Sequence, residues 1–320
     1  MLSNQFQKSI LKGVISVWLL SSFLFITWGL TPGDHFFLML RFEKWLALNA
    51  VGVAVAVSTY VFQTLTHSRI LTPSIMGLDA IYLLISLVII SALGTGSYLA
   101  IDAINLFLIN SLVMIGFALL IFGGLILRFH QDMNRLLLIG IVIGLLIQAL
   151  NEFLGRMISP EDFVVFQGAA FARFDQLDRQ VVWVALVLLT GCLCLIWRFH
   201  PVLDIFRLGR SHVINLGIAY VPMTCLFLML VAVLVSISTA LVGPILFFGL
   251  LVVALVQQCF PAGKSGYHLL LVAMVGALIL VAGQTLFEHV LSMKATLSVV
   301  IEVIGGCVFF MLLIKRGRSD

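Results

Sequence analysis

The sequence predicts an all-α fold, a polytopic bundle of transmembrane helices, from three observations. First, 62% of the 320 residues are hydrophobic and 10% are charged, whereas soluble domains carry about 25% charged residues. Second, apolar runs of roughly 20 residues, the length that crosses a bilayer as a helix, recur along the whole chain. Third, no polar stretch is long enough to close its own core, so residues 1–320 are expected to form a single transmembrane domain.

About ten spans are predicted along the chain. The eighth is short for a full crossing. Gly243 and Pro244 before it and Gly249 within it favour a broken or re-entrant helix, and Pro244 is expected to set its start. The spans are expected at residues 10–30, 45–66, 77–94, 104–127, 134–154, 181–199, 213–238, 245–260, 268–289 and 295–314.

The distribution of basic residues predicts the orientation. One set of alternate loops and ends holds twelve Lys and Arg residues and the other holds six, which together are all 18. Because cytoplasmic loops carry the excess of basic residues, the first set and both termini are predicted to be cytoplasmic. That set consists of Lys8, Lys12, Arg69, Arg128, Arg135, Arg198, Arg207, Arg210, Lys264, Lys315, Arg316 and Arg318, and the other of Arg41, Lys44, Arg156, Arg173, Arg179 and Lys294.

Two polar segments separate long apolar runs. Residues 198–217 are predicted to form two short helices that meet at a turn at Gly209, the second closed by Gly217. A bilayer protein has little reason to keep such a segment unless another protein docks on it. On the opposite face, residues 151–180 are too apolar for a disordered linker and predict a short helix on the outer rim.

Two further segments break helical periodicity. Pro73 and Gly77 interrupt residues 62–79, which is either a tight turn between spans or irregular backbone covered by protein or water. In residues 242–250, Gly243 and Gly249 allow close helix approach, although this segment could serve packing alone. Gly140 and Gly144 form a small-residue face that is expected to pack span against span.

Four landmarks, in order, resemble the permeases that import ferric siderophores, haem and vitamin B12. Residues 62–79 resemble their pattern Gln-x-Leu-x-x-Asn-Pro-Leu-x-x-Pro-x-x-Leu-Gly, and residues 242–250 resemble Ala-Gly-Pro-Ile-x-Phe-x-Gly-Leu. Residues 208–217 resemble their coupling segment Leu-Gly-x-x-x-Ala-x-x-Leu-Gly, and residues 297–306 resemble their last span. The resemblance covers most of the chain.

The chain departs from the family pattern at two places. Residues 68–71 are Ser-Arg-Ile-Leu where the family has Asn-Pro-Leu, and Val253, Ala254 and Gln257 stand where many members carry Pro, His and Arg. These departures resemble a branch of siderophore permeases that work beside a second, different permease. The resemblance therefore implies a heterodimeric pore rather than a homodimer.

The resemblance also implies that two separate ATPase subunits grip the coupling segment, since permeases of this family hold no ATPase site and are not enzymes. Gly263-Lys-Ser265 looks like the end of a P-loop, but Gln258 stands where that motif requires Gly. Arg207 and Arg210 are expected at the rim of the ATPase contact. The residues expected to couple to the ATPase are Arg207, Leu208, Gly209, Val213, Ile214, Leu216 and Gly217, with Val213 and Ile214 on the apolar side that fills its groove.

Arg41 and Lys44 fall where the family docks a periplasmic or lipid-anchored binding protein, although a snorkelling role at the membrane surface explains them equally well. Glu302 is the one acid well inside a span, where an acid is costly enough to suggest a role. It could line the pathway, cap a helix or set the partner interface. The pathway or helix-interface candidates are Asn49, Gln63, Gln148, Gly243, Pro244, Gly249, Gln284 and Glu302. No catalytic, cofactor or metal-ligand set and no nucleic-acid site is expected.

These observations and the resemblance favour the permease subunit of an ATP-driven importer for a ferric siderophore, of catecholate type, in a bacterial inner membrane. It would work by alternating access, and iron would pass as a chelate. A cobalamin or haem importer is the alternative within the family. An ion-gradient-driven secondary transporter is the alternative outside it, but that class commonly places ionisable residues at mid-membrane, and only Glu302 qualifies.

Overall fold

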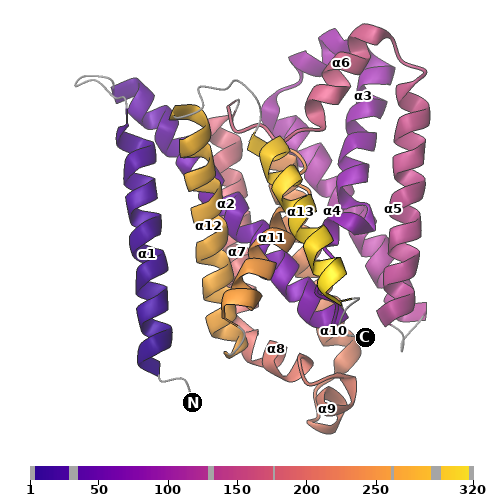
Figure 1. The fold of residues 1–320 in the computed structure, drawn as a ribbon. Helices are drawn as coiled ribbons and strands as arrows, with labels where there is room; N and C mark the ends of the chain where they lie inside the picture. The colour runs from indigo at the N-terminus through magenta and orange to yellow at the C-terminus, as the bar shows by residue number, and fades with distance from the viewer. Residues whose placement is uncertain are drawn as a thin grey trace.

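The computed structural model describes residues 4–28, 35–128, 133–175, 177–260, 263–289 and 297–316. These residues form helices and no strand, which confirms the all-α prediction (Figure 1). The helices are α1 Asn4–Thr27, α2 His35–Thr66, η1 Pro73–Met76, α3 Leu78–Ala100, α4 Ala103–Arg128, α5 Met133–Gly155, α6 Pro160–Ala169, α7 Arg179–Arg198, α8 His200–Phe206, α9 Arg210–Asn215, α10 Tyr220–Val242, α11 Phe248–Cys259, α12 Ser265–His289 and α13 Leu297–Arg316.

Every predicted span corresponds to one helix of the described chain. Eight helices are long and apolar enough to cross a membrane: α1, α2, α3, α4, α5, α7, α10 and α12. The eighth predicted span is α11, which has 12 residues and is short for a full crossing, as predicted. The tenth corresponds to α13, and its crossing of the membrane stays a prediction. α1 begins and α13 ends at the same end of the bundle, which also carries α8 and α9, while α6 lies at the other end (Figure 1). This arrangement agrees with an even number of crossings.

Helix α2 lies at the centre of the bundle, where it packs against α10, α11 and α12. It is the most deeply buried of the spans. Its crossing with α12 depends on two glycines, because a Cβ at Gly276 would stand 2.5 Å from the carbonyl oxygen of Gly52. Glycines at such crossings let helix backbones approach closely, which is a main source of attraction between helices in lipid.

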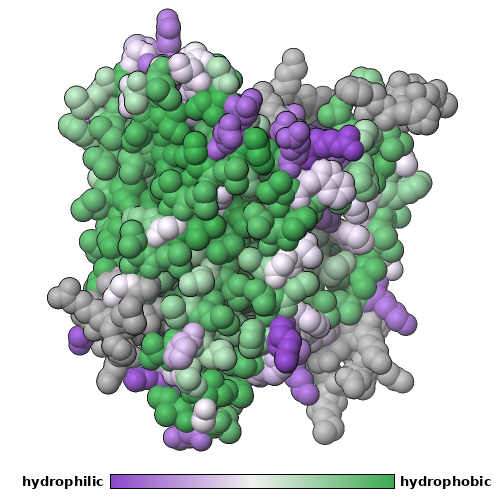
Figure 2. All heavy atoms as spheres, turned by 180° about the vertical axis from the view of Figure 1, so that it is seen from behind, coloured by the Kyte–Doolittle hydropathy of each residue, from purple (hydrophilic) through white to green (hydrophobic). Residues whose placement is uncertain are grey.

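The outside of the bundle is as apolar as its core. Seen from behind, hydrophobic side chains cover the middle of the molecule, and the hydrophilic ones gather mainly toward the two ends (Figure 2). Large side chains such as Leu120, Val187 and Phe23 are mostly exposed. In water such a surface would drive aggregation, whereas in a bilayer it faces acyl chains.

Two predicted span starts were wrong by seven residues or more. α2 begins at His35, ten residues before the predicted start, because a helix continues past the apolar stretch where its charged side chains find partners. The seventh span begins at Tyr220 rather than at 213. The intervening residues belong to α9 and to a turn in which Gly217 has a φ of 77°, a left-handed conformation that stops the helix.

Candidate functional site

A cavity of about 700 Å³ lies between η1, α3, α5 and α6, and the segment joining α10 to α11 and one residue of α13 complete its wall. That volume is in the range of small-molecule binding sites. Aromatic rings of Phe163, Phe166 and Phe171 line it near α6. The polar and charged lining side chains are Ser74, Asp79, Gln148, Asn151, Glu152, Arg156, Gln167 and Glu302.

The first wall of the cavity is built by η1 and the start of α3. Thr72 is extended, Pro73 opens the short 3-10 helix, and Gly77 closes it with a φ of 92°. A Cβ at Gly77 would lie 2.7 Å from the Cα of Gly144 on α5. The glycine face predicted on α5 therefore does pack another element, and the break at residues 73–77 is irregular backbone that borders a cavity, as such backbone must inside a membrane.

The segment between α10 and α11 forms a second wall. Gly243 follows α10 with a φ of 97°, and its Cα faces Phe171 and Ala172, so a Cβ there would stand 3.2 Å from the Phe171 carbonyl oxygen. The prediction that Pro244 sets the helix start was wrong, because α11 begins only at Phe248. Pro244 instead lies in non-helical chain and lines the cavity.

Gly249 serves helix packing rather than the cavity. It lies in the first turn of α11 against α2, where a Cβ would stand 2.0 Å from Oγ1 of Thr59 and 3.0 Å from the carbonyl oxygen of Val55. A side chain at this position cannot fit unless the two helices separate. Of the two alternatives left open by the sequence, the structure therefore selects the helix interface for this glycine.

Two carboxyl groups from distant parts of the chain line the cavity. Asp79, in the first turn of α3, is 5% exposed, and Thr239 Oγ1 of α10 donates a hydrogen bond of 3.1 Å to its Oδ1. Glu302 of α13 is half-buried and lines the same cavity. Its role among the three alternatives stays a prediction. Asp79 was noticed at the start of its span but was not predicted as a site residue.

Asn49 and Gln63 lie away from the cavity and hold neighbouring chain in place. Asn49 Oδ1 accepts a 2.8 Å hydrogen bond from Trp18 Nε1 and so joins α1 to α2, and its Nδ2 donates to the Trp45 carbonyl oxygen. Gln63 Nε2 donates to the Arg69 carbonyl oxygen at 3.1 Å, which pins the turn after α2. Both are structural contacts, the helix-interface alternative.

Sequence reasoning did not assign α6 to the cavity. The rim helix predicted in residues 151–180 is present, and Ser159 caps it, with its Oγ accepting from the Asp162 backbone N–H at 3.2 Å. Thr95 of α3 donates a hydrogen bond to Asp162. These hydroxyl donors from Thr95 and Ser159 hold the pKa of the Asp162 carboxyl below its usual range. The phenylalanines at 163 and 166 were a usable signal, since helical spacing puts them on one face.

The segment from α8 to α9 has the predicted form of two short helices that meet at Gly209, whose φ is 99°. Leu208, Ile214 and Leu216 project outward and are 62%, 49% and 61% exposed. Val213 is 0% exposed, so the prediction that it fills a groove on another protein was wrong. Its side chain packs inside this chain, because one face of a short helix must be buried to hold the helix in place.

Side-chain contacts tie this segment to the ends of two long helices. Arg207 Nη1 donates to the Gly263 carbonyl oxygen at 2.9 Å, just before α12. Asp204 Oδ1 accepts from the Ser265 backbone N–H at 2.6 Å, in the first turn of α12. The Arg210 guanidinium lies over the Tyr220 ring, 5.6 Å from its centroid, at the start of α10. The segment from α8 to α9 is therefore held by side-chain contacts to the starts of α10 and α12.

Arg41 and Lys44 both lie within α2 rather than in a loop before it. Lys44 is largely buried between two acids, with an ion pair of 2.5 Å to Asp175 and another to Glu288 of α12. Lys44 was predicted to dock a binding protein or to snorkel, and its charge is instead matched by two acids inside the chain. Arg41 is partly exposed, and its Nη1 donates to the Trp28 carbonyl oxygen at 2.5 Å.

An all-helical bundle with an apolar outer surface, a cavity bordered by interrupted helices and a braced end segment fits a multi-pass membrane transport protein. The chain belongs to the FecCD transport family, whose model matches residues 8–315. Family and relatives together make it a transport subunit rather than an enzyme.

Relatives and a solved structure agree with this assignment. The chain is 39% identical over 318 residues to the petrobactin import system permease protein YclO of Bacillus subtilis, covering 99% of both chains. It is 28% identical to the petrobactin import system permease protein FatC of Bacillus anthracis, over 85% of this chain and 77% of that one. A solved inward-facing structure assigned to the metal-chelate type of ABC transporter shares the fold, with a TM-score of 0.82, 20% identity, and coverage of 97% and 99% of the two chains.

Proposed function

We propose that this chain is the permease subunit of an ATP-driven importer that carries a ferric siderophore, of catecholate type, across a bacterial inner membrane. The observation that carries the proposal is the full-length similarity to the petrobactin import permease, at 39% identity. The whole chain acts as one transmembrane domain, because a single cluster of buried hydrophobic residues includes side chains from Phe25 of α1 to Ile301 of α13.

The cavity lined by Asp79 and Glu302 is the part of the pathway that this chain supplies. Its walls come from helices that end or break within the membrane-spanning region. In transporters of other folds, the substrate site is formed by interrupted helices of this kind. Its charged lining comprises three acids, Asp79, Glu152 and Glu302, and one base, Arg156. We propose that Glu302 faces the passing chelate, because an acid inside a span costs free energy that a purely structural role does not require.

The segment from α8 to α9 receives the motion of the ATPase. Leu208, Ile214 and Leu216 are the exposed apolar side chains available to enter a groove on the ATPase, while Arg207 and Arg210 lie near the rim. The buried side chain of Val213 packs the segment against the rest of this chain, and Gly209 and Gly217 form its turns. Because Arg207 and Asp204 contact the start of α12, a displacement of this segment reaches helices of the core. Alternating access follows when these helices rearrange.

The orientation of the bundle indicates where the binding protein docks. The end with α8, α9 and the excess of basic residues is cytoplasmic, and the end with α6 meets a periplasmic or lipid-anchored binding protein, with Arg41 within reach of its acids. A second, different permease completes the pore. If so, Arg41→Glu weakens docking of the binding protein at low ionic strength, and the loss shrinks as salt is raised.

The experiment that tests the function is uptake by the assembled transporter in reconstituted membranes. Ferric catecholate siderophores, ferric hydroxamates, haem and cobalamin are offered in turn, with and without ATP. We expect ATP-dependent uptake of a ferric catecholate. Uptake of cobalamin or haem alone would replace the substrate assignment, and uptake driven by an ion gradient without ATP would overturn the class.

A further inference from the structure

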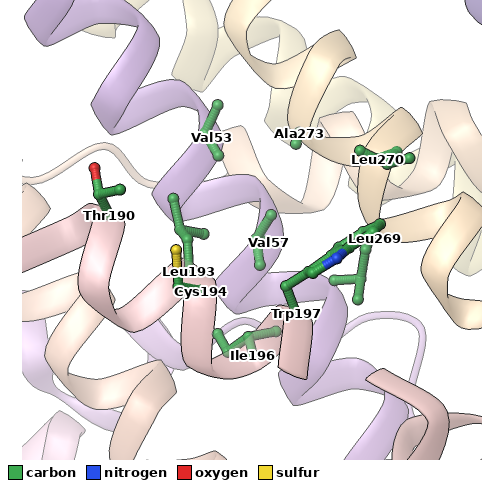
Figure 3. A pocket seen from close by; sticks show the side chains of 10 residues that line it. All are labelled: Val53, Val57, Thr190, Leu193, Cys194, Ile196, Trp197, Leu269, Leu270 and Ala273. Atoms are coloured by element: carbon green, nitrogen blue, oxygen red, sulfur yellow. The ribbon is translucent and has the colours of Figure 1, made fainter. Parts of the chain in front are cut away.

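A second hollow, on the outside of the bundle, has no part in the pathway. It is an apolar groove of about 310 Å³ between α2, α7 and α12 (Figure 3). None of these helices lines the transport cavity. The groove is lined by Val53, Val57, Thr190, Leu193, Cys194, Ile196, Trp197, Leu269, Leu270 and Ala273.

The groove opens to the surroundings of the protein rather than to its interior. Val57, Ile196 and Leu269 are buried and form its floor, whereas Trp197 and Leu270 are exposed. Figure 3 shows the Trp197 ring of α7 beside Leu269 of α12. Because α7 and α12 are membrane spans, the medium that meets this opening is lipid, and apolar walls with a single hydroxyl suit an acyl chain.

The end of the groove is positively charged. Arg198 ends α7, one residue beyond Trp197, and Lys264 directly precedes α12. Both side chains are exposed, and neither forms an ion pair with any residue that the structure describes. The nearby acid, Asp204, already accepts the backbone N–H of Ser265. Arg198 and Lys264 therefore stand at the ends of α7 and α12 that border the groove, with no ion-pair partner among the described residues.

We propose that this groove binds one anionic phospholipid, with an acyl chain along Val57, Ala273 and Leu193 and the headgroup phosphate between Arg198 and Lys264. Basic pockets between transmembrane helices recognise anionic headgroups in this way. The His200 ring, stacked on Trp197 with 5.0 Å between centroids, closes the same end. A lipid held here bridges α7, which leads directly into α8, and α12, whose start contacts Asp204 and Arg207 of the segment from α8 to α9.

The test measures lipid retained by the purified chain in native mass spectrometry, with dioleoyl phosphatidylglycerol and dioleoyl phosphatidylcholine as probes. We expect one tightly bound phosphatidylglycerol and at least tenfold weaker retention of phosphatidylcholine, since the acyl chains are identical and only the phosphatidylglycerol headgroup carries a net negative charge. Arg198→Gln with Lys264→Gln removes the headgroup contacts, and its matched control is Lys12→Gln, an exposed cation of α1. The double variant should lose the preference for phosphatidylglycerol, and the control should keep it.

A second variant tests the acyl-chain site. Ala273→Leu fills the groove, and Ala92→Leu adds the same bulk at an exposed position of α3. Ala273→Leu should lower retention of both lipids at least fivefold, with no change for Ala92→Leu. Equal retention of the two lipids by the unmodified chain, or full retention by the double charge variant, would overturn the proposal. The charge variant alters only exposed side chains, so it decides the question even if Ala273→Leu fails to fold.

Discussion

Replacing Gly209 by alanine should weaken coupling through backbone strain alone. Gly209 has φ 99° and ψ 163°, a conformation essentially confined to glycine and costing other residues about 1–3 kcal/mol. No atom lies within 4 Å of a Cβ built at this position, so the added methyl group clashes with nothing. If the turn must adopt this conformation to bind the ATPase, the same free energy raises the dissociation constant about 5- to 150-fold.

The assay titrates the ATPase subunit against the permease in lipid nanodiscs and follows ATP hydrolysis stimulated by the loaded binding protein. We expect the half-saturating ATPase concentration to rise within that range for Gly209→Ala. Ser211→Ala is the matched control, since Ser211 is an exposed residue of α9 with ordinary helical backbone. If Gly209→Ala saturates at the same ATPase concentration as the control, the turn is not part of the coupling surface.

Three other expected outcomes follow from the structure. Glu302→Gln should preserve the melting temperature in detergent but lower chelate uptake about tenfold, because an intramembrane acid is kept for function; normal uptake would remove Glu302 from the pathway. Gly249→Ala should lower the free energy of unfolding by about 1–3 kcal/mol through overpacking against α2, whereas Gly191→Ala, with no atom within 4 Å, should not, and equal losses would contradict the interface. Because the folded-state pKa of Asp162 is lowered, its stabilisation of α6 is present above the ordinary pKa of about 4 and is lost as pH falls through the lower folded value; hydrogen exchange of α6 should therefore accelerate on acidification, and Asp162→Asn should abolish that dependence.

Helix packing explains why some of the predicted polar residues line the cavity while others hold neighbouring parts of the chain together. Asn49 and Gln63 satisfy neighbouring donors and acceptors, and nothing in an apolar span distinguishes such a residue from one that faces a cavity. Lys44 illustrates the same limit for charges, because its two acids lie on other elements. Only the position of those elements decides whether the lysine is free.

The sequence by itself determined the features that depend on neighbouring residues along the chain. An apolar run of about 20 residues spans a bilayer whatever its partners are, so the eight long apolar helices were predictable. The turns at Gly77, Gly209 and Gly243 were also predictable as breaks, and all three glycines have positive φ. The family motifs lie on these same segments.

Only the tertiary structure decided which residues of different helices meet. Asp79 and Glu302 line one cavity although most of the chain separates them, and Val213 turns inward while Leu216, three residues later, turns outward. Both outcomes depend on which helices pack together and at which rotation. In lipid, small residues and polar contacts set that packing rather than a periodic apolar face, because the surrounding solvent is as apolar as the core.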